Sequence, residues 1–122
     1  MTNITEIRTD NFDEEVLKAA TPVVADFYAP WCGPCRMLTP MLHSLAGQYD
    51  GQLKFVKVNV DNAPELADRF GITGVPTLML FKGGLVLDTI VGLPSQRALQ
   101  RRLEELAALS APREPAPALA AA

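Results

Sequence analysis

The feature that most constrains the fold is a continuous apolar run at residues 22–28, PVVADFY, which leads directly into a helical pattern. A run of this length, rich in branched side chains, is typical of a strand buried on both faces of a sheet. From Pro34 to Tyr49 the apolar residues instead recur at the spacing of one helical face. A buried strand that feeds straight into a helix predicts an α/β protein with helices on both faces of a sheet.

The rest of the chain continues this alternation of strands and helices. Further strands are expected at residues 3–7, 53–60, 77–81 and 85–91, and further helices at 12–20, 62–70 and 95–109. Asn62 followed by Glu65 is the pattern of a capping box at the start of one helix, and Gly71 ends that helix. The last two strands flank Lys82-Gly83-Gly84 and read as a hairpin. We therefore expect a mixed five-stranded sheet flanked by four helices.

Composition bounds the chain to one domain and excludes several classes of protein. The chain has 122 residues and a net charge of −3, with acids and bases mixed along it. This is enough for one core, and it lacks the basic stripe of a nucleic-acid-binding protein. No apolar run approaches the roughly 20 residues of a membrane span, and the polar N-terminus does not read as a secretory signal. We expect a cytoplasmic domain at residues 1–109, with no nucleic-acid or membrane partner, and a disordered Ala/Pro-rich tail at 110–122.

The only two cysteines, Cys32 and Cys35, lie in the segment WCGPC at the junction of the buried strand and its helix. A structural staple here would be weak, because closing a four-residue loop gives about 1.9 kcal/mol, against roughly 4.7 kcal/mol for a 100-residue loop. A structural zinc site normally needs four ligands, and the chain adds only His43, on the expected solvent face of its helix. A metal shared between two chains stays an alternative.

A reaction centre fits the position of the cysteines better. The carboxyl end of a strand in an open α/β sheet is the usual place for function. The first turn of the following helix offers free N–H groups and the positive end of the helix dipole to a thiolate at Cys32. One helical turn brings Cys35 within bonding distance, so Cys32 can attack a disulfide and be released when Cys35 attacks in turn. Pro34 has no N–H to lose at a helix start, and it stiffens the ring that the disulfide closes.

Asp26 is the single acid in the buried run. An unpaired carboxylate inside a sheet is costly, so its pKa is expected to rise. Lys57, in the next strand, is expected near it and would offset part of that rise. The alternative is that Asp26 points to solvent at a strand edge.

The chain resembles the thioredoxin family over roughly residues 5–109. Four segments carry the resemblance, in the family's order and at its spacing: VADFYAPWCGPC, KVNVD, FGITGVPTLMLFKGG and IVG. The resemblance implies the thioredoxin fold, with Cys32 as the attacking nucleophile and Cys35 as the resolving thiol. It also implies that Asp26, accompanied by Lys57, shuttles a proton for Cys35, through water. One departure is Tyr28, which stands where many family members have a second tryptophan.

The resemblance further implies a shallow surface on which a protein substrate binds. The residues concerned are Trp31, Gly33, Pro34, Val60, Gly74, Val75, Pro76, Val91 and Gly92. In the family, the backbone before a cis-proline pairs with an extended substrate peptide, which here means Gly74 and Val75. Pro76 would then be the cis-proline facing the disulfide, while the local sequence alone also fits an ordinary trans proline in a turn.

The function implied is that of a monomeric protein-disulfide reductase. Its partners would be disulfide-containing proteins and a thioredoxin reductase, flavin-dependent or ferredoxin-linked. No cofactor is expected, because the chain has no glycine-rich phosphate loop. One alternative is a disulfide oxidase or isomerase, although such relatives usually carry a histidine where this chain has Gly33-Pro34. The others are a non-catalytic binding subunit that uses the same apolar surface, and a metal carrier.

Overall fold

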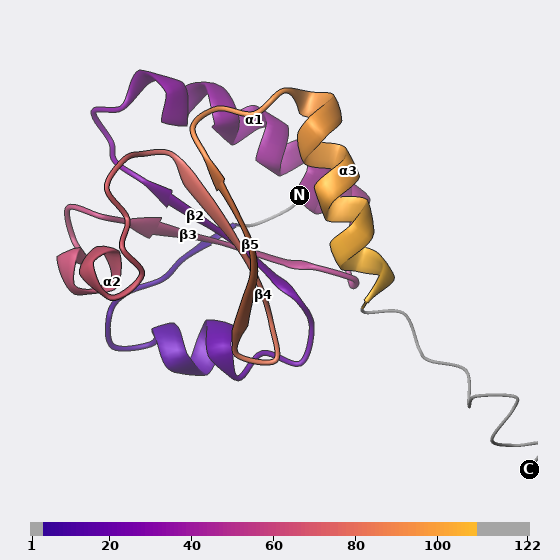
Figure 1. The fold of residues 1–122 in the computed structure, drawn as a ribbon, viewed down its shortest axis with the longest axis horizontal. Helices are drawn as coiled ribbons and strands as arrows, with labels where there is room; N and C mark the ends of the chain where they lie inside the picture. The colour runs from indigo at the N-terminus through magenta and orange to yellow at the C-terminus, as the bar shows by residue number, and fades with distance from the viewer. Residues whose placement is uncertain (1–3, 110–122) are drawn as a thin grey trace, which may run out of the picture.

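The computed structural model describes residues 4–109, so the predicted tail at 110–122 lies outside the described residues. The elements along the chain (Figure 1) are β1 (Thr5–Glu6), η1 (Asp13–Leu17, a short π-helix), β2 (Val23–Tyr28), α1 (Gly33–Gln48), β3 (Lys54–Asn59), α2 (Pro64–Arg69), β4 (Thr77–Lys82), β5 (Leu85–Val91) and α3 (Gln96–Ala108). The strands lie side by side in the order β1-β3-β2-β4-β5. β3 pairs in parallel with both β1 and β2, whereas β4 is antiparallel to β2 and to β5. The predicted mixed sheet with four helices is confirmed.

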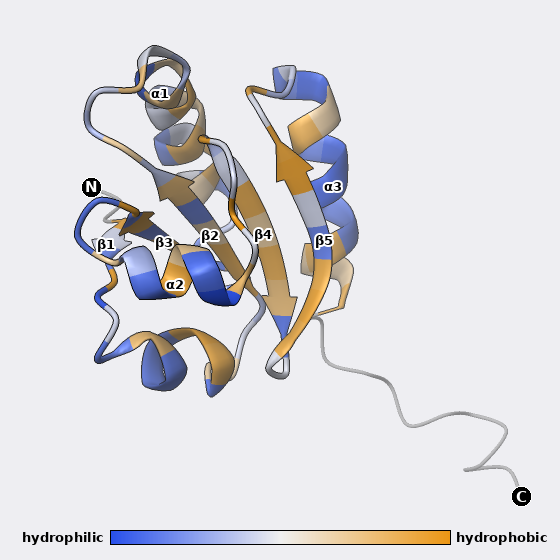
Figure 2. Ribbon diagram, turned by 60° about the vertical axis from the view of Figure 1, so that its left-hand side comes forward, coloured by the Kyte–Doolittle hydropathy of each residue, from blue (hydrophilic) through white to orange (hydrophobic). Residues whose placement is uncertain are grey.

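Helices cover both faces of the sheet. Successive strand residues point to opposite faces, so each central strand contributes side chains to two cores. In β2, Val24 packs into a core with residues of α1 and α3, while Ala25 and Phe27 pack into a second core with residues of η1 and α2. Figure 2 shows hydrophobic residues along the central strands and hydrophilic ones on much of the helical surface. Within residues 4–109, no helix is both long and apolar enough to cross a bilayer.

The predicted hairpin joins β4 to β5 through a two-residue turn. Both turn residues have positive φ, 59° at Gly83 and 82° at Gly84. Tight hairpin turns with positive φ at both central positions match the twist of the flanking strands, and glycine adopts this conformation without steric cost. The turn places β5 at the edge of the sheet, where its last residue, Val91, pairs with Thr77 at the start of β4.

The capping box predicted at Asn62 is wrong. α2 begins one residue later than a cap at Asn62 requires: its N-cap is Ala63, with no side-chain cap. The turn that leaves β3 is held instead by Asn59, whose carbonyl accepts the N–H of Ala63 at 2.9 Å. Glu65, the other half of the predicted box, accepts a hydrogen bond from the Thr9 hydroxyl at 3.0 Å. A long-range contact therefore replaces the local one that the sequence pattern suggested.

Candidate active site

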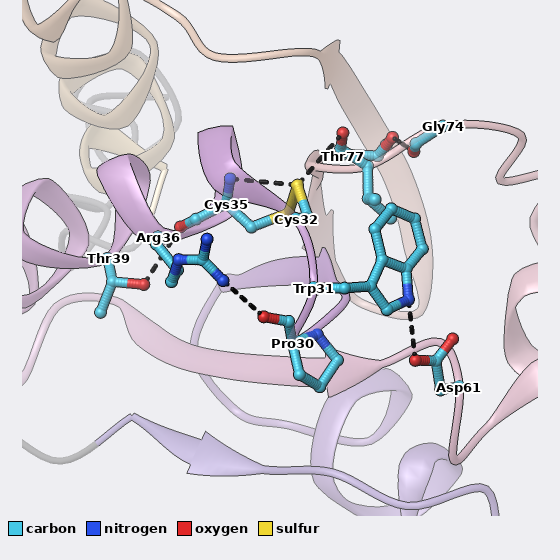
Figure 3. The surroundings of a disulfide bond; sticks show 10 residues. Pro30, Trp31, Cys32, Cys35, Arg36, Thr39, Asp61, Gly74 and Thr77 are labelled. Atoms are coloured by element: carbon cyan, nitrogen blue, oxygen red, sulfur yellow. Dashed lines mark hydrogen bonds between the residues drawn. A yellow bond between two sulfur atoms is a disulfide. The ribbon is translucent and has the colours of Figure 1, made fainter.

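Cys32 and Cys35 lie where β2 gives way to α1, and they are joined by a disulfide with a Cα–Cα separation of 5.3 Å (Figure 3). Cys32 is the N-cap residue of α1, and the Cys35 N–H donates to its Sγ at 3.1 Å. Pro34 lies in the first turn of α1, where a missing N–H costs no helical hydrogen bond. The pairing expected from the sequence is therefore present, and it closes one turn at a helix start.

This position favours a thiolate at Cys32 once the disulfide is reduced. The sulfur then accepts the Cys35 N–H and lies at the positive end of a 16-residue helix. Both cysteines are mostly covered, with 5% of Cys32 and 2% of Cys35 exposed. Trp31, in contrast, is 69% exposed.

The loop before β4 lies across from the disulfide. The Val75–Pro76 peptide bond is cis, so the cis-proline implied by the resemblance is confirmed. The Val75 carbonyl oxygen is 3.7 Å from Cys32 Sγ. The disulfide sulfur carries no hydrogen, but the thiol of the reduced protein can donate to this oxygen. On the other side of the loop, the Gly92 N–H donates to the Pro76 carbonyl at 2.8 Å, which ties the end of β5 to the site.

A groove of about 280 Å³ adjoins the disulfide. Four of the predicted contact residues line it: Trp31, Val60, Gly74 and Val75. Val60 and Val75 also pack against the buried cysteines. Val91 is not part of the groove wall; it pairs with Thr77 across the β4–β5 ladder and is 74% exposed. Of the predicted contact residues, four therefore line one groove, whereas Val91 lies outside it at the exposed end of β5.

Asp61 and several residues that line the groove were not anticipated from the sequence. The Trp31 Nε1–H donates to the Asp61 carboxylate at 3.0 Å, which fixes the indole beside the disulfide (Figure 3). Asp61 lies two residues after the end of β3, at the same sheet edge as Cys32, so the rule that function gathers at strand carboxyl ends would have found it. The lining is completed by Pro64, Ala67, Asp68, Ile72 and Thr73.

Asp26 is buried in β2, with 5% of the residue exposed. Its register partners are Lys57 in β3 and Leu78 in β4. It projects to the same face as Val24, the face that α1 covers. Burial raises the pKa of the Asp26 carboxyl to about 7, and the Lys57 ammonium opposes part of that rise. The expectation of a buried acid is therefore confirmed, and Asp26 does not point to solvent at a strand edge.

Metal-ligating side chains do not gather around the cysteines. Residues 4–109 contain no group of three or more His, Cys, Asp or Glu side chains placed to hold a metal ion. His43 is exposed on α1.

Comparison with known proteins assigns this site to a family. The family model described as Thioredoxin matches residues 3–105. The chain belongs to the thioredoxin family. Family membership and the Cys32–Cys35 pair together support thiol–disulfide oxidoreductase function, and proteins named thioredoxin are protein-disulfide reductases. Nothing in these comparisons favours a disulfide oxidase or isomerase.

The chain spans nearly the full length of several relatives. It is 45% identical over 105 residues to Thioredoxin 1 of Nostoc sp., which covers 86% of this chain and 98% of the relative. It is 48% identical over 94 residues to Thioredoxin 1 of Synechococcus elongatus, covering 77% of this chain and 88% of the relative. It is also 41% identical over 99 residues to the chloroplastic M-type thioredoxin of Chlamydomonas reinhardtii, covering 81% of this chain and 71% of the relative.

Proposed function

We propose that this chain reduces disulfides in other proteins, with Cys32 as the nucleophile and Cys35 as the resolving thiol. The observation that carries the proposal is the geometry of the reactive turn. The Cys35 N–H points at Cys32 Sγ from the first turn of a helix, beside an open groove large enough for a peptide side chain. Residues 1–109 would form the catalytic domain.

The reaction follows from two successive thiol–disulfide exchanges. The Cys32 thiolate attacks one sulfur of the substrate disulfide, forming a mixed disulfide, and the other substrate sulfur leaves as a thiolate and takes up a proton. Asp26 then accepts the Cys35 thiol proton, through water. The Cys35 thiolate attacks Cys32 Sγ, and the second substrate sulfur leaves as a thiolate. Two electrons pass to the substrate, and the Cys32–Cys35 disulfide remains on the protein.

The substrate would lie along the groove and the loop facing the disulfide. Gly74 and Val75 would pair with an extended substrate backbone, since glycine lets another chain approach closely. Trp31 and Val60 would contact the substrate on the groove side. The remaining proposed contacts are Gly33, Pro34, Pro76, Val91 and Gly92. The mixture of exposed apolar side chains and small residues supports this arrangement.

A thioredoxin reductase would return electrons to the disulfide, because the chain itself carries no nucleotide-binding loop. We propose a monomer, since the disulfide and its groove are complete within one chain. We also propose a cytoplasmic location, where the redox poise keeps a dithiol available. The chloroplastic relative makes an organelle the alternative location.

The proposal is tested by NADPH-coupled reduction of insulin disulfides with a bacterial thioredoxin reductase. NADPH oxidation is expected to require both proteins and to stop in the Cys32→Ser/Cys35→Ser double variant. A parallel assay with dithiothreitol as electron donor separates a mismatched reductase from an inactive protein. If insulin is reduced no faster than by dithiothreitol alone, and no reductase supports turnover, the chain is not a general protein-disulfide reductase.

A further inference from the structure

A row of ionisable side chains crosses the sheet beneath α1. Glu6 of β1 is the register partner of Lys57 of β3, and Lys57 is the register partner of Asp26 of β2. Directly opposed residues on neighbouring strands project to the same face. The carboxylates of Asp26 and Glu6 therefore flank the ammonium group of Lys57, and each of them can attract it.

Tyr28 interacts with both Lys57 and Glu6. It is two residues along β2 from Asp26 and projects to the same face. Lys57 Nζ lies 5.9 Å from the centroid of the Tyr28 ring, and the Tyr28 hydroxyl donates to Glu6 Oε1 at 2.8 Å. Among residues 4–109, Lys57 makes no close ion pair with a carboxylate. The Glu6 carboxylate therefore accepts a hydrogen bond from the Tyr28 hydroxyl and forms no close ion pair with the neighbouring Lys57.

Few other titratable groups face Asp26. From α1, Cys35 belongs to the buried cluster against which Tyr28 packs, and it titrates only when the disulfide is reduced. β4 places Leu78 beside Asp26, and α3 contributes Leu99 to the same core; neither side chain ionises. The electrostatic environment of the carboxyl is therefore set chiefly by the lysine and by what holds that lysine in place.

We propose that Tyr28 is a positioning residue whose hydroxyl occupies the Glu6 carboxylate, keeps Lys57 available to Asp26, and so sets the pH at which Asp26 exchanges its proton. This rests on the shuttle role proposed for Asp26. The Tyr28 hydroxyl stays protonated and keeps its hydrogen bond to Glu6 at neutral pH, because burial and Glu6 raise the pKa of Tyr28 to about 12. The Lys57 charge matters to the carboxyl because it opposes the effect of burial on the pKa of Asp26.

The proposal predicts opposite effects from two conservative substitutions. Tyr28→Phe keeps the ring but frees the Glu6 carboxylate to draw Lys57 away, so the pKa of Asp26 is expected to rise. Glu6→Gln removes the competing charge, so the pKa of Asp26 is expected to fall. Moving or removing one charge on a neighbouring strand is expected to change the pKa of Asp26 by about half a unit. A general loosening of the sheet would shift both variants the same way.

The test is an NMR titration of the Asp26 side-chain carboxyl carbon in the oxidised protein. Glu65→Gln is the matched control, because Glu65 is also an exposed glutamate that accepts a hydroxyl hydrogen bond, from Thr9. The expected result is a raised pKa in Tyr28→Phe, a lowered one in Glu6→Gln, no change in the control, and no effect of Tyr28→Phe once Glu6 is glutamine.

The proposal is overturned if Tyr28→Phe leaves the Asp26 titration unchanged, if both variants shift it in the same direction, or if the Tyr28→Phe shift survives in the double variant. The titration is read on the carboxyl itself and needs no turnover. The role of Tyr28 is therefore decided even in a protein that fails to reduce insulin.

Discussion

Replacing Cys35 with serine is expected to stop the reaction at a covalent complex between Cys32 and the substrate protein. Cys32 keeps its place at the start of α1 and can still attack. No second thiol is then available to release the substrate, because Cys32 and Cys35 are the only cysteines in the chain. Multiple turnover should be lost entirely, and non-reducing mass spectrometry should find an adduct that dithiothreitol removes.

The matched control is Cys32→Ser, which should form no adduct and show no turnover. Cys35 alone is expected to be the poorer nucleophile, since it is the more deeply buried of the two and lies inside the helix rather than at its cap. An adduct that forms through Cys35 in Cys32→Ser, and not through Cys32 in Cys35→Ser, would reverse the two roles.

Replacing Asp26 with asparagine is expected to stabilise the disulfide form at neutral pH. In the unfolded chain the carboxyl ionises near the ordinary aspartate pKa of 3.8, whereas burial holds the pKa near 7 in the folded protein. Between these values the folded state binds more protons than the unfolded state, so the stability of the native protein falls as pH rises through this window. The full penalty, present above about pH 7, is about 4 kcal/mol at most.

Urea unfolding of the two proteins at several pH values measures this effect. The gain from Asp26→Asn should be absent near about pH 4 and should grow to its maximum above about pH 7. Asp50→Asn, at an exposed acid just after α1, is the control for the change in net charge. A gain that is equal at all pH values would show that the ionisation of Asp26 is not its source.

The same substitution should slow the resolving step. The wild-type rate should rise with pH as the Asp26 carboxyl ionises near pH 7, and this rise should flatten in Asp26→Asn. At neutral pH the loss is expected to be about 100-fold or more, because a positioned proton acceptor typically contributes about 100- to 10,000-fold. Stopped-flow release of substrate from the mixed disulfide measures it. Full turnover by Asp26→Asn across neutral pH would remove the shuttle role.

Much of the fold was predictable because it depends on local patterns. Three local patterns each predicted the conformation of their own segment: the apolar run before Cys32, the helical spacing after it, and the glycine pair of the hairpin. The burial of Asp26 was predictable for the same reason: an acid inside a run of strand residues that is buried on both faces has no solvent to face.

The features that the sequence did not predict depend on which residues come into contact in the folded chain. Asn62 has the right local pattern for a cap. The carbonyl of Asn59 instead accepts the N–H of Ala63, and the helix begins after Ala63. The hydrogen bond between Tyr28 and Glu6 requires the register of β1 on β3, and β1 is only two residues long. So short a strand carries too little alternation to fix its pairing from sequence.

The most direct test of the central claim is a single turnover without any reductase. The reduced protein, freed of reductant, is mixed with insulin, and both products are analysed by mass spectrometry after acid quenching. Each insulin disulfide lost should be matched by one protein molecule that has lost two hydrogens, with the new bond mapped between Cys32 and Cys35. Unchanged insulin beside a protein that stays fully reduced would contradict the account.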